Sequence, residues 1–171
     1  QHQQLYGKYP QSITADAGYG SHENYQFLQD NNIEGYVKYN TFDNEQKRKA
    51  TNKKGFTSNE LFYNAEQDCY YCPMGQRMQY ISTSTRTTEN GFQQQLKKYQ
   101  AQNCKGCPLR SVCHQSKDNR TIEINHQLIQ LKSKANENLK SEQGIEHRKK
   151  RCYTIEPVFA CLKQNKNFKR F

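Results

Sequence analysis

The chain has 171 residues, of which 33% are hydrophobic, and its mean hydropathy is -1.20. This apolar share is below that of an ordinary globular domain, so the chain is predicted to lack part of its fold. The net charge of +10 favours a polyanionic partner such as nucleic acid, although charge alone is equally typical of a merely soluble surface. No stretch reaches the roughly 18 to 20 apolar residues of a membrane helix, so a soluble protein is expected.

Seven cysteines bear on the cell compartment. The opening run, Gln1-His2-Gln3-Gln4, has neither the apolar core nor the cleavage pattern of a signal peptide. Clustered thiols in such a chain are typical of a reduced cytoplasmic setting, where cysteines bind metals more often than they form disulfides. Because the first residue is Gln rather than Met, we expect an excised or truncated segment.

A β-α-β unit is predicted at the start of the chain. Residues 12–16 form a short β-prone run that ends in an aspartate and is followed by a glycine turn at 18–20. Ser21 then has the side chain of a helix N-cap, which predicts a short helix after it. Residues 33–39 alternate well enough for a second strand, and a strand-helix-strand unit of this length favours parallel strands.

The middle of the chain is predicted to interrupt this α/β domain. Residues 40–59 are polar and basic without a sustained period, which favours a loop. Residues 60–124 hold five of the seven cysteines and short β-prone pieces, so they are predicted to form an insert. The predicted division is 1–59 for half of the central sheet and the basic loop, 60–124 for the insert, and 125–171 for the C-terminal helices.

Two helices are predicted in the last part of the chain. Residues 125–139 carry a moderate helical period, and a Glu-Gln-Gly break follows. The basic block 147–151 comes next, and a further helix is expected to start or kink at Pro157, because proline removes a backbone donor. Its apolar positions recur at i, i+3, i+4 and i+7, which predicts a buried face. The residues of this face are Ile155, Val158, Phe159 and Leu162.

Two carboxylates stand in settings that catalytic acids use, although neither is persuasive alone. Asp16 would lie at the end of a strand, before glycines that leave the backbone open to a bulky substrate. An aspartate at such a place also commonly satisfies turn amides. Glu156 follows the basic block and precedes the apolar helix face, which is equally typical of a charged helix end. Lys163 lies seven residues beyond Glu156 and therefore near the same helix face.

The residues around both carboxylates resemble motifs of one family. Thr-Ala-Asp-Ala-Gly-Tyr-Gly-Ser, at 14–21, resembles the second-aspartate motif of the DDE transposases of bacterial insertion sequences. Thr-Ile-Glu-Pro-Val-Phe-Ala-Cys-Leu-Lys, at 154–163, resembles their glutamate motif, and the two motifs follow in the expected order. The resemblance covers almost the whole chain, including the cysteine insert.

This resemblance implies metal-dependent cleavage and transfer of DNA strands at insertion-sequence ends. It implies a ribonuclease H-like fold, α/β in class, in which Asp16 and Glu156 are two of three acidic ligands for a pair of Mg²⁺ or Mn²⁺ ions. No candidate for the first aspartate precedes Asp16, so a partial fold without its N-terminal strands is expected, inactive by itself. The expected partner is double-stranded DNA, both at the insertion-sequence ends and at the target. The active form is expected to be a homodimer or higher multimer in the cytoplasm, at the nucleoid.

Four basic residues are predicted to contact DNA. By the same resemblance, Lys163 and Arg151 would bind phosphate near the cleaved bond, and Lys149 and Lys150 adjoin Arg151 in the basic block. The chain departs from the wider pattern at Cys152, where a related branch has an arginine four residues before the glutamate. Arg151 is the candidate substitute, and its exact role stays open.

The clustered cysteines predict a structural Zn²⁺ site. Cys104-x2-Cys107-x5-Cys113 and Cys69-x2-Cys72 supply enough thiolates for tetrahedral zinc, which would staple an insert poor in apolar residues. The quartet that also matches the family's cysteine positions is Cys72, Cys104, Cys107 and Cys113, and Cys69 is an alternative to Cys72.

Other roles for the thiols stay open. An iron–sulfur cluster would use the same four thiolates, and unliganded thiols are the third alternative. His114, next to Cys113, is a spare ligand. Cys161, on the last helix, is predicted to be a small buried hydrophobe, and Cys152 has no assigned role. Tyrosines of the insert are expected to pack in strands rather than stack on bases.

Two further functions compete with the transposase prediction. A non-enzymatic, zinc-stabilised nucleic-acid-binding module would explain the charge and the cysteines with the carboxylates incidental. A thiol-disulfide protein is the third class, but no thioredoxin-like pattern surrounds either cysteine pair. The discriminating geometry is whether Asp16 and Glu156 converge to within about 6 Å, as shared metals about 4 Å apart require.

Overall fold

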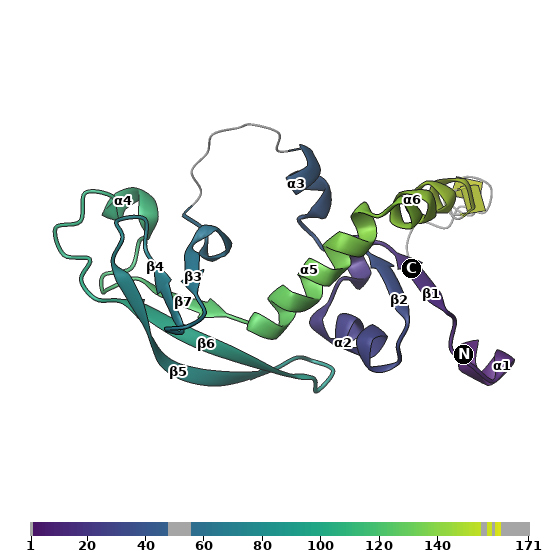
Figure 1. Cartoon of the computed structure of the whole chain (residues 1–171), viewed down its shortest axis with the longest axis horizontal. Coiled ribbons are helices and arrows are strands. Elements are labelled where there is room, and N and C mark those ends of the chain that lie inside the picture. The colour runs from purple at the N-terminus through teal and green to yellow at the C-terminus, as the bar shows by residue number, and fades with distance from the viewer. Residues whose placement is uncertain (1, 48–55, 155–156, 159, 162–171) are drawn as a thin grey trace. The chain divides into compact units, whose positions relative to one another are not determined.

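The computed structural model describes residues 2–47, 56–154, 157–158 and 160–161. It contains helices, a parallel pair of strands and an antiparallel sheet, which confirms the predicted α/β class (Figure 1). The chain divides into two compact units, one made of residues 1–49 and 128–171 and the other of residues 50–127. The three-part division predicted above stays a prediction.

The first unit begins with the β-α-β arrangement that the sequence predicts. After helix α1 (His2–Tyr6), strand β1 (Ser12–Ala15) pairs in parallel with β2 (Glu34–Val37). The 3-10 turn η1 (Ala17–Tyr19) and helix α2 (His22–Asp30) connect the strands. The Ser21 hydroxyl accepts a hydrogen bond from the Asn24 backbone N–H at 3.1 Å, so the predicted N-cap is confirmed.

An apolar cluster holds helix α2 to the two strands and to helix α5 (His126–Lys140). The Tyr25 hydroxyl is buried in it and donates to the Val37 carbonyl oxygen at 3.1 Å, and burial raises its pKa to about 12. The remaining buried members are Leu28, Ile33, Val37, Leu131 and Ala135. The residues at i and i+4 on α5 therefore cover one face of the two strands.

Helix α6 (Glu142–Thr154) packs against both strands. The His147 ring stacks on Tyr36, with 4.4 Å between centroids, and its Nδ1 lies 3.3 Å from the Thr14 hydroxyl. The Tyr36 hydroxyl donates to Gln143 at 3.1 Å. The predicted break between the two helices therefore falls at Ser141, and the Glu-Gln-Gly residues assigned to it open α6, which the basic block continues.

Helix α3 (Phe42–Lys47) is a second difference from the sequence prediction, which has a loop over 40–59. Phe42 is fully buried and packs with Tyr36, Tyr39 and Leu139. One aromatic residue thus anchors a polar segment that has no helical period of its own. A further turn, η2 (Ser58–Glu60), begins with a capping box, and residues 48–55 lie outside the described residues.

The second unit is an antiparallel sheet whose strands follow chain order. Its core face holds Tyr70, Met78, Tyr99 and Ile122, all buried. Long strands β5 and β6 form its central hairpin, and the short helix α4 (Arg110–Cys113) lies in the connection between β6 and β7. The strands are β3 (Phe62–Asn64), β4 (Cys69–Tyr71), β5 (Arg77–Thr87), β6 (Gln93–Ala101) and β7 (Thr121–Ile124).

A hydrogen-bonded carboxylate organises the tyrosines beside this core. Asp68 accepts from the hydroxyls of Tyr63 and Tyr99, each at 2.7 Å, and from the Lys97 ammonium at 2.8 Å. Tyr99 also lies 2.8 Å from Nε2 of His126. The pKa of Asp68 is lowered to about 2, mainly by the hydrogen bond from Lys97 and next by that from Tyr99.

Gly144 permits the close approach of α5 and α6. A Cβ atom there would collide with the Asn138 carbonyl oxygen and lie 2.9 Å from Leu139 Cα. Gly144→Ala is therefore expected to destabilise the chain by about 2 kcal/mol, as overpacking does, despite the better helix propensity of alanine. Thermal unfolding followed by circular dichroism measures the change. The matched control is Gly18→Ala, where a Cβ meets nothing within 4 Å, and equal midpoints for both variants would contradict the explanation.

The Asp68 network predicts a pH-dependent stability. Its folded pKa of about 2 lies below the ordinary 3.8, so its stabilisation is complete above about pH 4 and is lost as the pH falls towards 2. Asp68→Asn is expected to lower the thermal midpoint at pH 7, and the difference from wild type should shrink between pH 4 and pH 2. Because asparagine tolerates the positive φ of 43° at this position, backbone strain does not confuse the comparison. A difference that is constant with pH would contradict the assignment.

Candidate active site and cysteine cluster

Asp16 directly follows strand β1, at its C-terminal end. It is the N-cap residue of η1 but makes no side-chain cap hydrogen bond there, so its carboxylate is not used by the turn amides. The side chain is 54% exposed. An accessible carboxylate at a strand end can accept hydrogen bonds from a cationic side chain or a substrate donor, or can coordinate a metal ion.

Arg151, in the last turn of helix α6, binds both oxygens of that carboxylate. Its Nη1 donates to Oδ1 of Asp16 at 2.7 Å and its Nη2 to Oδ2 at 2.6 Å. This fork-to-fork arrangement is the most directional ion pair that proteins make. Sequence analysis assigns both residues to one site but not to each other, since 135 positions separate them and no local pattern links them.

The neighbouring cations of α6 have different surroundings. The Arg148 guanidinium lies over the Phe42 ring, 5.4 Å from its centroid, and donates to the Gly144 carbonyl oxygen. Lys149 and Lys150 are exposed. Of the basic block, Arg148 therefore contributes to packing, whereas the two lysines are accessible to a soluble polyanion.

Part of the predicted glutamate motif lies outside the described residues, including Glu156 and Lys163. Two nearby residues are described, and both differ from expectation. Val158 is 57% exposed and Cys161 is exposed, so the predicted burial of both side chains is wrong. Helical spacing defines an apolar face but does not supply an element to cover it.

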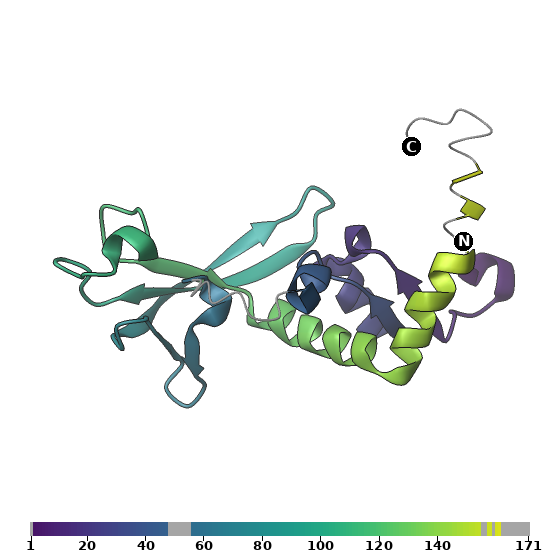
Figure 2. The same ribbon diagram turned by 90° about the horizontal axis from the view of Figure 1, so that it is seen from above.

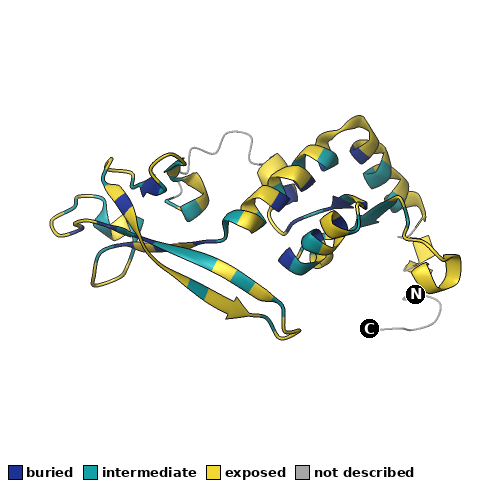
Figure 3. Cartoon of the chain, turned by 60° about the horizontal axis from the view of Figure 1, so that its bottom comes forward, coloured by how far each residue is buried: buried dark blue, intermediate teal, exposed yellow. Residues whose placement is uncertain are grey.

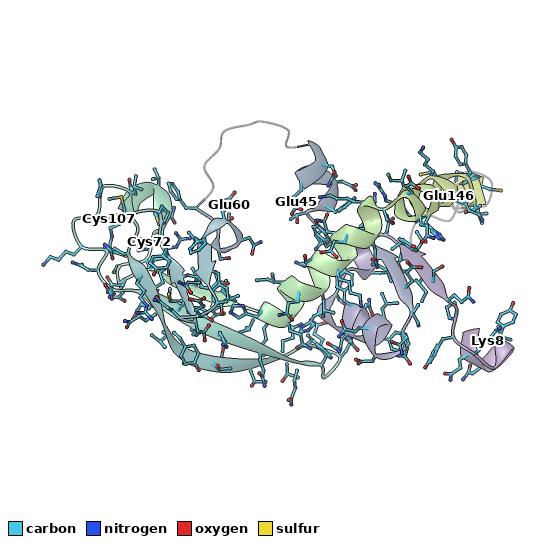
Figure 4. The ribbon with its side chains drawn as sticks, viewed as in Figure 1. Lys8, Glu45, Glu60, Cys72, Cys107 and Glu146 are labelled. Carbon is cyan, nitrogen blue, oxygen red and sulfur yellow. The ribbon has the colours of Figure 1, made fainter. Side chains whose placement is uncertain are left out.

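Four cysteines of the second unit line one small cavity of about 20 Å³. They come from the turn after β4, the loop after β6 and helix α4, and Figure 4 labels two of them, Cys72 and Cys107. Cys69, the alternative ligand, is fully buried but does not line this cavity. The four lining thiols are Cys72, Cys104, Cys107 and Cys113, the quartet named by the sequence.

Tight turns shape the two Cys-x2 segments. The Gly75 N–H donates to the Cys72 carbonyl oxygen at 2.8 Å, with Gly75 at a φ of +75° that side chains rarely adopt. The Cys107 N–H donates to the Cys104 carbonyl oxygen at 3.4 Å. Both turns therefore lie at cysteines that line the cavity.

Arg120 donates to two of these sulfurs and is a site residue that sequence analysis misses. It is only 7% exposed, and its Nη1 lies 2.9 Å from Cys113 Sγ. Its backbone N–H donates to Cys104 Sγ at 3.4 Å. Hydrogen bonds and positive charge stabilise thiolates over thiols. No local pattern marks an arginine before a strand as a thiolate partner.

His114 also lines this cavity. Both of its ring nitrogens are buried without a hydrogen-bond partner among the residues that the structure describes. Burial, and then the charges of Arg110 and Arg120, lower its pKa, so the ring is held neutral. A neutral imidazole can donate its lone pair to a metal.

Within the described ranges, no group of three or more His, Cys, Asp or Glu side chains is already placed to hold a metal ion. This holds for the four cysteines and for the surroundings of Asp16. The cysteine donor set fits zinc in chemistry and number. The Asp16 oxygens are hard donors of the kind that Mg²⁺ and Mn²⁺ prefer.

Comparison with known proteins gives one match. A family model described as a transposase DDE domain matches residues 71–171, more than half of the chain. No curated protein and no solved structure matches. The chain therefore belongs to the transposase DDE domain family, as the motifs predict.

The matched region has a definite relation to the site residues. It includes the four cysteines of the cavity, Arg151 and Glu156, and it begins after Asp16. Membership of the family implies DNA as the partner and divalent metal ions in the chemistry. Among the helices of the described residues, none has the length and apolar character needed to cross a bilayer.

Proposed function

We propose that the chain contributes Asp16 and Glu156, the second and third carboxylates of a DDE transposase centre, to metal-dependent DNA cleavage and strand transfer at insertion-sequence ends. The observation that carries the proposal is the bidentate pair between Asp16 and Arg151. Arg151 and Glu156 are five positions apart, so the chain between their Cα atoms spans at most about 18 Å. This short reach supports a common site for Asp16 and the glutamate motif.

The proposed chemistry divides between metal ions and side chains. Bound Mg²⁺ or Mn²⁺ ions would activate the attacking water or 3′-hydroxyl and stabilise the leaving oxygen. Arg151 orients the Asp16 carboxylate through two hydrogen bonds, and its guanidinium fork matches a phosphate as well as a carboxylate. The exposed Lys149 and Lys150, with Lys163, would hold the DNA backbone through salt-sensitive contacts.

A ribonuclease H-like fold needs further strands besides β1 and β2. The catalytic centre also needs a first aspartate, for which there is no candidate before Asp16. We therefore expect no strand cleavage by this chain alone. In the complete enzyme, a homodimer or higher multimer would bring two element ends together at the nucleoid.

Paramagnetic broadening by Mn²⁺ tests the carboxylate site without requiring catalysis. In nuclear magnetic resonance spectra of the 171-residue chain, Mn²⁺ should broaden amide signals around Asp16 and around Glu156 together. Asp16→Asn removes a ligand carboxylate, so about tenfold more Mn²⁺ should be required for the same broadening. Mg²⁺ should restore the wild-type signals by competition.

Asp43→Asn is the matched control. Asp43 is another exposed aspartate of the first unit, 57% exposed, and it pairs with Lys38 at 3.0 Å much as Asp16 pairs with Arg151. Broadening that is equal in both variants, or that centres on Asp16 without reaching Glu156, would contradict the shared site and favour a nucleic-acid-binding module without catalytic carboxylates.

A structural zinc ion on the four cavity cysteines is the second part of the proposal. Four cysteines line the cavity, and Arg120 donates hydrogen bonds to two of their sulfurs. A tetrahedral zinc ion would take all four sulfurs as ligands at about 2.3 Å. Zinc would then stabilise a sheet whose apolar core is small.

Metal analysis checks this part. The purified chain is expected to contain one zinc ion, and Cys104→Ser or Cys113→Ser should abolish its retention and lower the thermal midpoint. Cys72→Ser should have the same effect, whereas Cys69→Ala should keep the metal. Exposed Cys152, changed to Ser, is the neutral control. Visible absorption with bound iron would instead establish the iron–sulfur alternative, and a chain without metal would leave free thiols.

A further inference from the structure

The β5–β6 hairpin extends beyond the rest of its sheet (Figure 1). Strand β4 pairs with β5 only over Arg77–Gln79, and β7 pairs with β6 only over Lys97–Gln100. From Ser84 and Leu96 to the turn, the hairpin is therefore a two-stranded ribbon, seen from a second side in Figure 2. Its free edges are not covered by any strand of the described sheet.

Neither face of this ribbon is buried. Every residue from 82 to 98 is exposed or intermediate, and Figure 3 shows the distal half without a buried position. A hairpin that packs on a core alternates apolar and polar side chains, whereas this one carries Ser, Thr and Gln on both faces. Packing inside the second unit therefore does not account for its length or its composition.

One face of the ribbon is more accessible than the other. On it, Thr85 is paired with Gln95 and Thr87 with Gln93, and all four side chains are exposed. The opposite face contains Leu96 and Gln94, which are partly buried. The first face thus presents hydroxyl and amide groups side by side, with no apolar residue among them.

We propose that this ribbon enters the major groove of duplex DNA and turns Gln93, Gln95 and the facing threonines towards the base edges. The inference rests on the proposed function, in which the chain binds DNA. A major groove about 12 Å wide and about 8.5 Å deep admits a two-stranded β-ribbon, and a minor groove of about 6 Å does not. Four residues of a strand extend about 14 Å, so the ribbon is long enough to lie along the groove with one face towards several base pairs.

The chemistry of the exposed face fits base edges. A glutamine side chain can donate to N7 and accept from N6 of adenine as a bidentate pair after rotation of its amide, and threonine can contact either a polar edge or the thymine methyl group. The net charge of +10 on the chain points to a polyanionic partner, as DNA is.

The base of the ribbon is held firmly. Lys97 is paired with Asp68 at 2.8 Å, and Lys98 with Glu123 at 2.8 Å. Tyr99, fully buried, hydrogen-bonds to the same Asp68 carboxylate. These contacts fix the direction of the hairpin before it meets a partner, which reduces the conformational entropy lost on binding.

Substitution on alternate residues of β6 tests the face that is used. The probe is a duplex of about 30 base pairs that the wild-type chain selects from a random-sequence pool. Fluorescence anisotropy at constant salt should show at least about thirtyfold weaker binding for the double variant Gln93→Ala with Gln95→Ala, because two adenine-type contacts are lost. Gln94→Ala, between them on the opposite face, is the matched control and should change binding less than twofold.

The groove is tested separately with competitors. Methyl green, which occupies the major groove, should displace the wild-type chain, and netropsin, which occupies the minor groove, should not. Equal affinity of the double variant and wild type, or displacement by netropsin alone, overturns the inference. A selective loss of affinity with an unchanged thermal midpoint supports it, since all the altered side chains lie outside the core.

The outcomes also separate this inference from the proposal on which it rests. If the wild-type chain selects no duplex, both the proposed function and the ribbon inference are contradicted. If the wild-type chain and the double variant bind duplex DNA equally well, only the ribbon inference is contradicted, and DNA binding is left to the basic residues of α6. Gln95→Glu, which places a carboxylate against the DNA while keeping the side-chain shape, should weaken binding at least as much as alanine does.

Discussion

The ion pair between Asp16 and Arg151 is the contact on which the candidate active site depends. It joins the end of β1 to the last turn of α6, two segments 135 positions apart, with two hydrogen bonds of fixed direction. The stacking of His147 on Tyr36 and the small volume of Gly144 set α6 across the strands so that Arg151 can reach the carboxylate. A charge-assisted pair at this place also protects an accessible carboxylate until a metal ion or a phosphate competes for one of the partners.

The second unit solves a different problem, which is to order a sheet with few apolar residues. It does so with tyrosines, whose rings fill the core while their hydroxyls reach a partner. Asp68 accepts hydrogen bonds from two of these hydroxyls and from the Lys97 ammonium, and the Tyr99 hydroxyl also hydrogen-bonds with His126. At the other end of the unit, Arg120 gathers two cysteine sulfurs. Polar side chains with precise partners thus replace part of the burial that larger cores provide.

Local patterns predicted the elements that depend on local interactions. The glycine turn, the Ser21 cap and the two β-prone runs predicted the β-α-β opening because each signal acts within a few residues. Helix α3 was missed since its stability comes from one side chain, Phe42, that packs against residues far along the chain. The start of α6 was missed because a Gly that usually breaks helices is required here by the proximity of α5.

Sequence by itself determined the family, the four cysteines that share one cavity, and the two motifs that contain Asp16 and Glu156. These conclusions depend on residue type and spacing, which can be read directly from the sequence. Only the tertiary structure decided that Asp16 binds Arg151, that Arg120 lies at the cysteines, that Val158 and Cys161 are exposed, and that β5 and β6 continue past their sheet. Each of these facts concerns residues distant along the chain or the absence of a covering element among the described residues, and one-dimensional patterns do not encode either.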